Sequence, residues 1–284
     1  MNVSILTSVA CAVAASVPAS VRCAETSLQG PIPPAQRSPA GALQQAAPHV
    51  RASCSPVLLR TPDGRRFIDV GFVIEPGWHL YWRNPGDSGQ PPRLDLTLPE
   101  GWSAGAPLFP VPNHLPEDED ILAFERSLRL LIPVQAPAGW SGGPVKVIAR
   151  AQWMTCKEHC VVERQEFAAD LNEQPGPMPV GYPEALPANL VASLREDGEQ
   201  GVLVVDASAL GGTARWFPDA CPGVRFPSER MLPMPGGRIE IPVEIRPGDA
   251  PDRRPVVRGM VVVSAGDGTR AFDVAVPAPP SAAK

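Results

Sequence analysis

The chain has 284 residues, enough for one or two domains with a buried core. Its 25 Lys and Arg residues stand against 30 Asp and Glu residues, and the absence of any basic block argues against nucleic acid as a partner. Proline accounts for 37 residues, about 13% against about 5% in an average protein. Because proline interrupts long helices, this composition favours short strands joined by turns.

The first 24 residues have the character of an export signal. Residues 3–21 are small and apolar and contain no acidic residue, and Val17-Pro18-Ala19 offers a small-x-small cleavage site. The first few residues lack Lys and Arg, which leaves an uncleaved N-terminal anchor as the alternative. Beyond residue 25 no apolar run approaches the ~18–20 residues needed to span a bilayer. We therefore expect an exported protein with no transmembrane segment in its mature part.

After a Pro- and Ala-rich leader at residues 25–48, apolar and polar residues begin to alternate. Ile68, Val70, Phe72 and Ile74 share one face at a period of two, as in a half-buried strand. Further strands are expected at 94–98, 127–134, 145–153, 161–171, 201–207, 238–245, 256–264 and 271–276. This spacing, without a helical period, predicts an all-β protein built as a β-sandwich followed by a second, smaller one. The alternative is a single large sandwich.

Cys156 and Cys160 form the one close cysteine pair and are the expected redox site. In a continuous strand their Cα atoms would lie about 13 Å apart, at ~3.3 Å per residue. A disulfide requires a Cα separation within about 4.4–6.8 Å, so the three residues between them must turn the chain. Strand-like flanks on both sides favour a three-residue hairpin loop over a helical turn.

The residues between the two cysteines fit redox chemistry. Lys157 and His159 bring positive charge, which favours the attacking thiolate, whereas Glu158 opposes it. A disulfide that closes so small a loop removes little chain entropy, which favours an exchangeable bond. Two alternatives stay open: a structural clip in a binding or scaffold module, and a Cu(I) site made of Cys156, Cys160 and His159. Cys54 and Cys221 are expected to be small buried hydrophobes.

The second notable segment is GWHLYWRNPGDSGQPP at residues 77–92. It predicts an aromatic strand that runs into a tight, glycine-rich turn at Asn84-Pro85-Gly86-Asp87. Core packing is the expected role of the aromatics, Trp78 above all. His79 is expected to be a structural or surface histidine rather than a ligand.

Taken with Cys156-Lys157-Glu158-His159-Cys160, this segment resembles the N-terminal periplasmic domain of the DsbD and ScsB-like membrane thiol reductases. That group carries a GWHxYWRNPGDSGxPP segment and, some seventy residues later, CKxxC. The resemblance covers about residues 50–171. Pieces at 214–218 and 257–262 resemble the second subdomain of the same proteins. The family's usual Ile-Pro after the second cysteine is Val161-Val162 here.

The resemblance implies an immunoglobulin-like sandwich in the periplasm that acts as a thiol:disulfide oxidoreductase without a cofactor. Its pair Cys156 and Cys160 would relay electrons from a membrane-embedded thiol reductase to oxidised exported partners, thioredoxin-like proteins among them. Residues 120–125 would form a cap loop, and Phe124 in this loop would shield the pair. Because these 284 residues contain no Cys-x-x-Cys pair and no multi-helix membrane region, the electron source is expected to be a separate partner.

These observations together divide the chain into six expected parts. They are a signal peptide (1–24), a leader (25–48), a redox domain (49–172), a linker (173–186), a second β subdomain (187–276) and a tail (277–284).

Overall fold

The computed structural model describes residues 48–116, 120–197, 200–221, 223–226, 232–245, 256–266 and 268–277. The expected signal peptide, nearly all of the leader and nearly all of the tail lie outside these ranges. Within the described residues the fold is all-β, as predicted, and its one helical element is a 3₁₀ turn, η1 (Ser208–Leu210).

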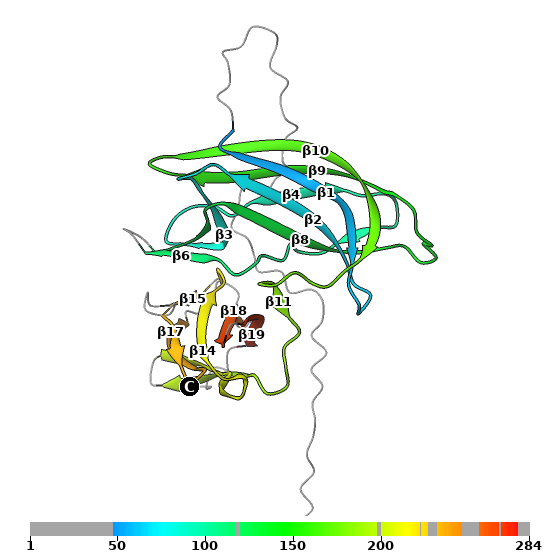
Figure 1. Ribbon diagram of the computed structural model, residues 1–284. Helices are drawn as coiled ribbons and strands as arrows, with labels where there is room; N and C mark the ends of the chain where they lie inside the picture. Colours follow the sequence, from blue (N-terminus) through cyan, green and yellow to red (C-terminus); the bar gives the residue numbers. More distant parts are fainter. Residues whose placement is uncertain are drawn as a thin grey trace, which may run out of the picture.

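The first part of the chain is an immunoglobulin-like β-sandwich of ten strands (Figure 1). One sheet has the order β5-β8-β2-β1, and the other has the order β10-β9-β3-β7-β6 with β4 also paired to β9. The strands are β1 (Val50–Arg60), β2 (Arg66–Ile74), β3 (His79–Gly86), β4 (Arg93–Thr97), β5 (Ser103–Ala104), β6 (Asn113–Pro116), β7 (Asp120–Phe124), β8 (Ser127–Gln135), β9 (Val145–Cys156) and β10 (Cys160–Pro175).

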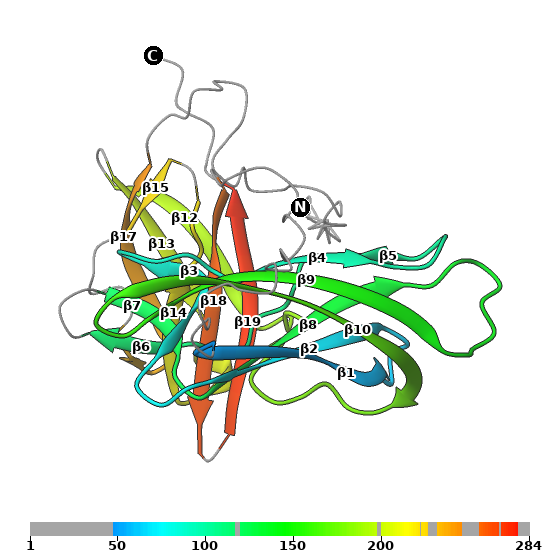
Figure 2. The same cartoon turned by 90° about the horizontal axis from the view of Figure 1, so that it is seen from above.

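The long strand β10 connects the two sheets. Its residues Cys160 to Leu171 pair antiparallel with β9, while Asn172 to Pro175 pair parallel with the end of β1. Seen from above, β9 and β10 run together across the width of the sandwich (Figure 2). Strand structure therefore continues to Pro175, three residues into the expected linker.

The core of this sandwich follows from the alternation in its strands. In β9 every second residue from Val145 to Trp153 is buried, and in β3 the residues Leu80 and Trp82 are fully buried. Phe72 meets Trp153 edge-to-face, with ring centroids 5.4 Å apart. Truncating one such aromatic side chain typically costs about 3–5 kcal/mol, so this layer stabilises the sandwich strongly.

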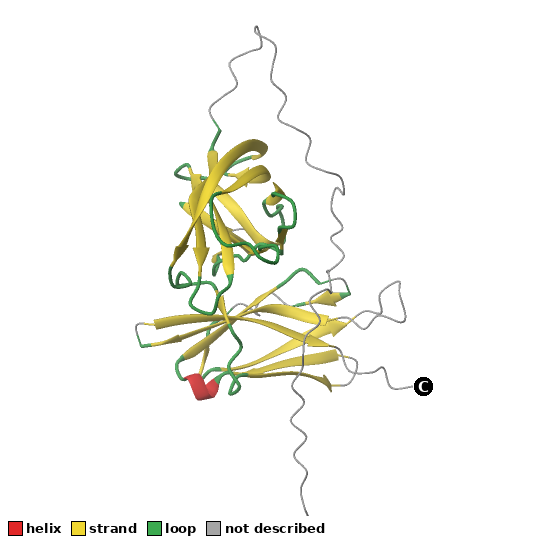
Figure 3. Ribbon diagram, turned by 90° about the vertical axis from the view of Figure 1, so that its right-hand side faces the viewer, coloured by secondary structure: helices red, strands yellow, loops and turns green. Residues whose placement is uncertain are grey.

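A second, smaller β-sandwich follows in the chain. Its sheets have the orders β11-β19-β18-β14-β16 and β12-β13-β17-β15, and they enclose a separate core around Trp216 and Phe272. The strands are β11 (Pro183–Glu184), β12 (Val191–Asp197), β13 (Gln200–Asp206), β14 (Thr213–Pro218), β15 (Val224–Arg225), β16 (Met234–Pro235), β17 (Arg238–Ile245), β18 (Val256–Ala265) and β19 (Gly268–Pro277). Figure 3 shows the two strand-rich bodies stacked on each other.

An ion cluster on β3 joins the two sandwiches. The Arg83 guanidinium lies 2.6 Å from carboxylate oxygens of both Asp219 and Asp273, and 4.7 Å from the centre of the Trp82 ring. The side-chain amide of Asn84 donates to the Pro218 carbonyl at 2.8 Å. Burial acts to lower the pKa of Arg83, but the two carboxylates outweigh it and raise that pKa, so Arg83 stays charged.

The linker between the sandwiches is held against the outside of the first one. The Tyr182 hydroxyl donates to the Arg129 carbonyl at 2.7 Å, and the Tyr182 ring packs with Phe67 and Leu131. The Arg129 guanidinium in turn binds the buried Asp69 carboxylate. Burial raises the pKa of Tyr182, which therefore stays neutral and keeps its proton for this hydrogen bond.

The Arg83 cluster leads to a stability prediction. Arg83→Met leaves the mostly buried Asp219 carboxylate, and the more exposed Asp273 carboxylate beside it, without their cation. Removal of one partner from a buried ion pair costs about 3 kcal/mol or more. We expect a loss of about this size in the free energy of unfolding, measured by urea denaturation. The control is Arg150→Met, which removes an exposed pair with Glu166 and should cost less than about 1 kcal/mol. Equal losses in the two variants would contradict the claim that the Arg83 cluster stabilises the protein more than the exposed pair does.

Candidate functional site

The tip of the β9–β10 hairpin carries a disulfide between Cys156 and Cys160. Cys156 is the last residue of β9 and Cys160 the first of β10, and the two face each other in the strand register with Cα atoms 4.1 Å apart. The Lys157 amide donates to the His159 carbonyl at 3.2 Å, which closes the loop. The expected three-residue hairpin is confirmed.

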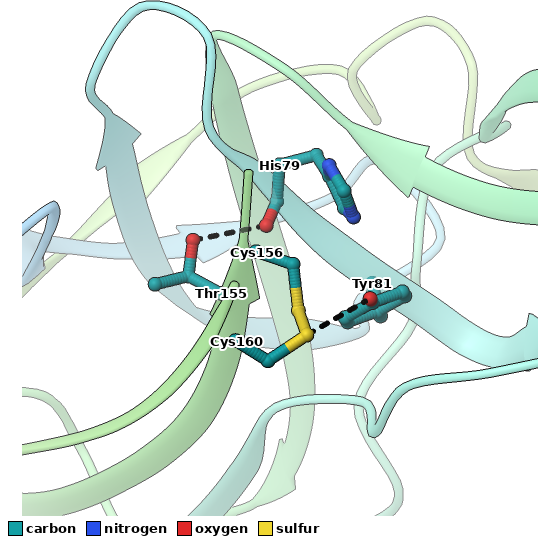
Figure 4. Close-up of a disulfide and its surroundings, with 5 residues drawn as sticks. All are labelled: His79, Tyr81, Thr155, Cys156 and Cys160. Atoms are coloured by element: carbon teal, nitrogen blue, oxygen red, sulfur yellow. Dashed lines mark hydrogen bonds between the residues drawn. A yellow bond between two sulfur atoms is a disulfide. The ribbon is translucent and has the colours of Figure 1, made fainter. Parts of the chain in front are cut away.

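The two sulfur-bearing residues differ in their access to solvent. Cys156 is only 3% exposed, whereas Cys160 belongs to the exposed residues of β10. The Tyr81 hydroxyl lies 4.0 Å from the Cys160 Sγ, and the Tyr81 ring is buried. Figure 4 shows Tyr81 beside the disulfide. An approaching reagent therefore meets Cys160 first.

Strand β3 lies next to the disulfide. His79 pairs with Cys156 in the antiparallel register, and the Thr155 hydroxyl donates to the His79 carbonyl at 2.9 Å. Tyr81, two residues further along, projects from the same face of the strand, and its ring meets the His79 ring edge-to-face at 5.1 Å. His79 thus lies in the site, closer to the chemistry than the sequence suggested.

The glycines of the segment 77–92 allow the backbone to approach the Tyr81 ring and strand β7 closely. A Cβ on Gly89 would lie 2.3 Å from the Tyr81 ring, and a Cβ on Gly86 (φ 95°) would lie 1.8 Å from the Asp120 carbonyl oxygen. The Asp87 amide donates to that same carbonyl, and the Asp120 amide donates back to the Asp87 carboxylate. The segment therefore covers Tyr81 and fixes β7 against β3.

The loop residues between the cysteines lie on the solvent side. Lys157 and His159 are both exposed, and the His159 ring meets Trp78 edge-on at 5.5 Å. The His49 ring stacks on the same indole at 3.7 Å. Trp78 is 6% exposed and part of the core cluster, as expected from the sequence. The predicted support of the thiolate by Lys157 and His159 stays a prediction.

Phe124 lies on the other face of the sheet from Tyr81. It pairs with Leu80 in the β3–β7 register and is buried in the sandwich core, while Ala123 pairs with Tyr81. The aromatic ring beside the disulfide is that of Tyr81. The shielding role of Phe124 stays a prediction.

Within the part of the chain that the structure describes, no three His, Cys, Asp or Glu side chains gather in a way that would hold a metal ion. The alternative Cu(I) site of Cys156, Cys160 and His159 stays a prediction. Among the same residues no helix is both long and apolar enough to cross a membrane.

Cys54 carries a free, half-buried thiol, so no disulfide ties it to Cys221. Burial, with a smaller contribution from the negative charge of Asp69, raises the pKa of the Cys54 thiol to about 11. Cys54 packs against the core, as expected, but Cys54 and Cys221 are both half-buried and not fully buried.

The first part of the chain is therefore an immunoglobulin-like sandwich with a disulfide at the tip of a hairpin. Residues 54–172 match the family described as "Thiol:disulfide interchange protein DsbD, N-terminal".

Solved structures give weaker likenesses. The N-terminal periplasmic domain of ScsB from Proteus mirabilis is 17% identical, with a TM-score of 0.49, covering 80% of this chain and 92% of that one. A protein of unknown function from Porphyromonas gingivalis W83 is 13% identical, with a TM-score of 0.22, covering 81% and 100%. The E. coli chaperone DraB is 11% identical, with a TM-score of 0.20, covering 79% and 95%. No curated protein matches the chain.

The raised pKa of Cys54 predicts how this thiol behaves with pH. Its alkylation by iodoacetamide in the folded protein should be slow at pH 8 and keep accelerating up to about pH 11, because only the thiolate reacts. Peptide mapping by mass spectrometry measures this rate. A rate that levels off near pH 9 would contradict the assignment.

The same shift affects stability. In the unfolded chain the Cys54 thiol ionises near pH 9, before it does so in the folded protein. Its contribution to the free energy of unfolding is therefore complete below pH 9 and is lost as the pH rises towards about 11. The Cys54→Ala variant should lack this part of the pH dependence in urea denaturation.

Proposed function

We propose that the protein is a periplasmic thiol–disulfide interchange protein whose Cys156–Cys160 pair alternates between disulfide and dithiol. The observation that carries this proposal is the disulfide across a three-residue loop, with Cys160 exposed, inside the segment that matches the DsbD N-terminal family. The bond closes a loop of five residues, for which the chain-entropy relation gives only about 2 kcal/mol of stabilisation. Such a bond is better suited to exchange than to holding a large sandwich together.

The difference in exposure assigns separate roles to the two cysteines. In the oxidised protein an incoming thiolate attacks the Cys160 Sγ, and Cys156 leaves as the thiolate. In the reduced protein the Cys160 thiolate attacks a partner's disulfide, and Cys156 then attacks Cys160 Sγ to release the reduced partner. Lys157 and His159, exposed in the intervening loop, favour the Cys160 thiolate by their positive charge.

The family match supports a position in an electron relay. We propose that a separate membrane-embedded thiol reductase reduces the pair and that oxidised exported proteins, thioredoxin-like ones among them, reoxidise it. The apolar residues 3–21, which precede the first charged residues Arg22 and Glu25, would direct the chain to the periplasm. The pair itself is the only redox group that this exchange requires.

Replacing both cysteines tests the proposal. The Cys156→Ser/Cys160→Ser variant should keep its β-sheet circular dichroism and lose at most about 2 kcal/mol of unfolding free energy. It should lose all capacity to reduce an insulin-type disulfide substrate in the presence of dithiothreitol. A variant that keeps its activity refutes the proposal. A large loss of stability, with a reduction potential below about −300 mV, would instead support the structural clip.

The single variants test the separate roles. Each retains Cys54 and Cys221, so the two variants are matched controls for each other. Cys160 in Cys156→Ser should react with oxidised glutathione at least about ten times faster than Cys156 in Cys160→Ser, because the buried thiol ionises poorly and is hard to reach. Intact mass measured over time gives both rates. Equal rates, or the reverse order, would contradict the assignment.

A further inference from the structure

We infer that His79 is the group that donates a proton to Cys156 when the disulfide opens and accepts it when the disulfide re-forms. This inference rests on the interchange function proposed above and concerns the same site. It gives a role in the proton transfer to a residue of the segment 77–92 that the sequence alone did not place in the site.

The need for such a group follows from the burial of Cys156. With only 3% of its surface exposed, its sulfur has little contact with water. A thiolate that forms there lacks solvation, and desolvation disfavours the charged form of a thiol. The exchange step at Cys160 therefore proceeds best when a neighbouring group neutralises the departing Cys156 sulfur.

His79 is the titratable side chain that β3 places opposite Cys156. Directly opposed residues of antiparallel strands have Cβ atoms about 4.5–5.5 Å apart and project from the same face. The hydrogen bond from the Thr155 hydroxyl to the His79 carbonyl fixes this register. Figure 4 shows the His79 ring and Tyr81 on the same side of the strand pair as the disulfide.

The surroundings of the His79 ring suit a proton exchanged between a buried sulfur and water. Its Nε2 is buried, while the residue as a whole is half-exposed. The other titratable groups nearby are Tyr81 and the three loop residues. The Tyr81 hydroxyl lies next to Cys160 and not next to Cys156. Lys157, Glu158 and His159 lie on the solvent side. Imidazole is also the side chain that titrates nearest to neutral pH.

The step balances as follows. A partner thiolate forms a bond to Cys160 Sγ, the Sγ–Sγ bond breaks, and the electron pair of that bond goes to Cys156 Sγ. The His79 imidazolium transfers its proton to this sulfur and becomes neutral imidazole. In the reverse direction neutral His79 takes the proton of the Cys156 thiol as Cys156 attacks Cys160 Sγ and expels the partner thiolate.

The pH profile of reduction tests this role, with dithiothreitol as the probe and His79→Gln as the variant. In the unsubstituted protein the rate constant, referred to the thiolate concentration of dithiothreitol, should fall as the pH rises from 5.5 to 8.5. In His79→Gln it should be independent of pH and, at pH 6, about ten or more times slower. His114→Gln is the control, since His114 pairs with Asp120 on the β6–β7 hairpin.

The possible outcomes separate this inference from the proposed function. If dithiothreitol does not reduce the disulfide of the folded, unsubstituted protein, the interchange function itself fails. If reduction occurs but His79→Gln keeps the original profile, the role of His79 fails and the function stands. A profile that flattens in His159→Gln and not in His79→Gln would assign the proton to the loop and would also overturn the inference.

A second measurement needs no substitution at His79. In ¹H–¹³C NMR spectra of the four histidines, reduction of the disulfide should shift the titration midpoint of His79 more than that of His114. The Cys156→Ser variant forms no disulfide and its hydroxyl does not titrate, so treatment with reductant should leave its His79 midpoint unchanged. An unchanged His79 midpoint on reduction would contradict the inference even if His79→Gln fails to fold.

Discussion

Twelve consecutive residue pairs join β9 to β10, from Leu171 opposite Val145 to Cys160 opposite Cys156. Because side chains alternate between the two faces of a strand, a slip of one residue in this register would turn Trp153 out of the core. The same slip would separate the two cysteines. Burial of the sandwich core therefore also fixes the geometry of the cysteine pair. Apolar residues far from the disulfide hold the two sulfur atoms at bonding distance.

Strand β3 contacts three parts of the molecule: the core of the first sandwich, the disulfide and the second sandwich. Leu80 and Trp82 face the core, and His79 and Tyr81 face the disulfide. The end of the strand, at Arg83 and Asn84, binds the second sandwich. The unusual density of aromatic, charged and glycine residues in the segment 77–92 follows from this multiple use. A substitution in this strand can therefore affect the core, the disulfide site and the interface between the two sandwiches.

Sequence reasoning predicted the features that depend on local chemistry. The separation of Cys156 from Cys160 required a turn, and alternating residues identified strands that the structure contains, β2 among them. It did not predict the partners of Arg83, because Asp219 and Asp273 lie 136 and 190 residues away in the chain. Nor did it place His79 opposite Cys156, since that depends on the pairing of two strands far apart in the sequence. The signal that was available was the alternation of His79 and Tyr81 with Leu80 and Trp82.

The fixed spacing of the two cysteine backbones bears on how long a partner stays attached. When a partner is bound to Cys160, the strand register still holds Cys156 directly across from it. The second attack is then intramolecular, and groups held in such proximity react as if at an effective concentration far above any that a free thiol reaches. Under the proposed interchange function, covalent complexes with partners are therefore expected to be short-lived, because the β9–β10 register holds the second cysteine in place.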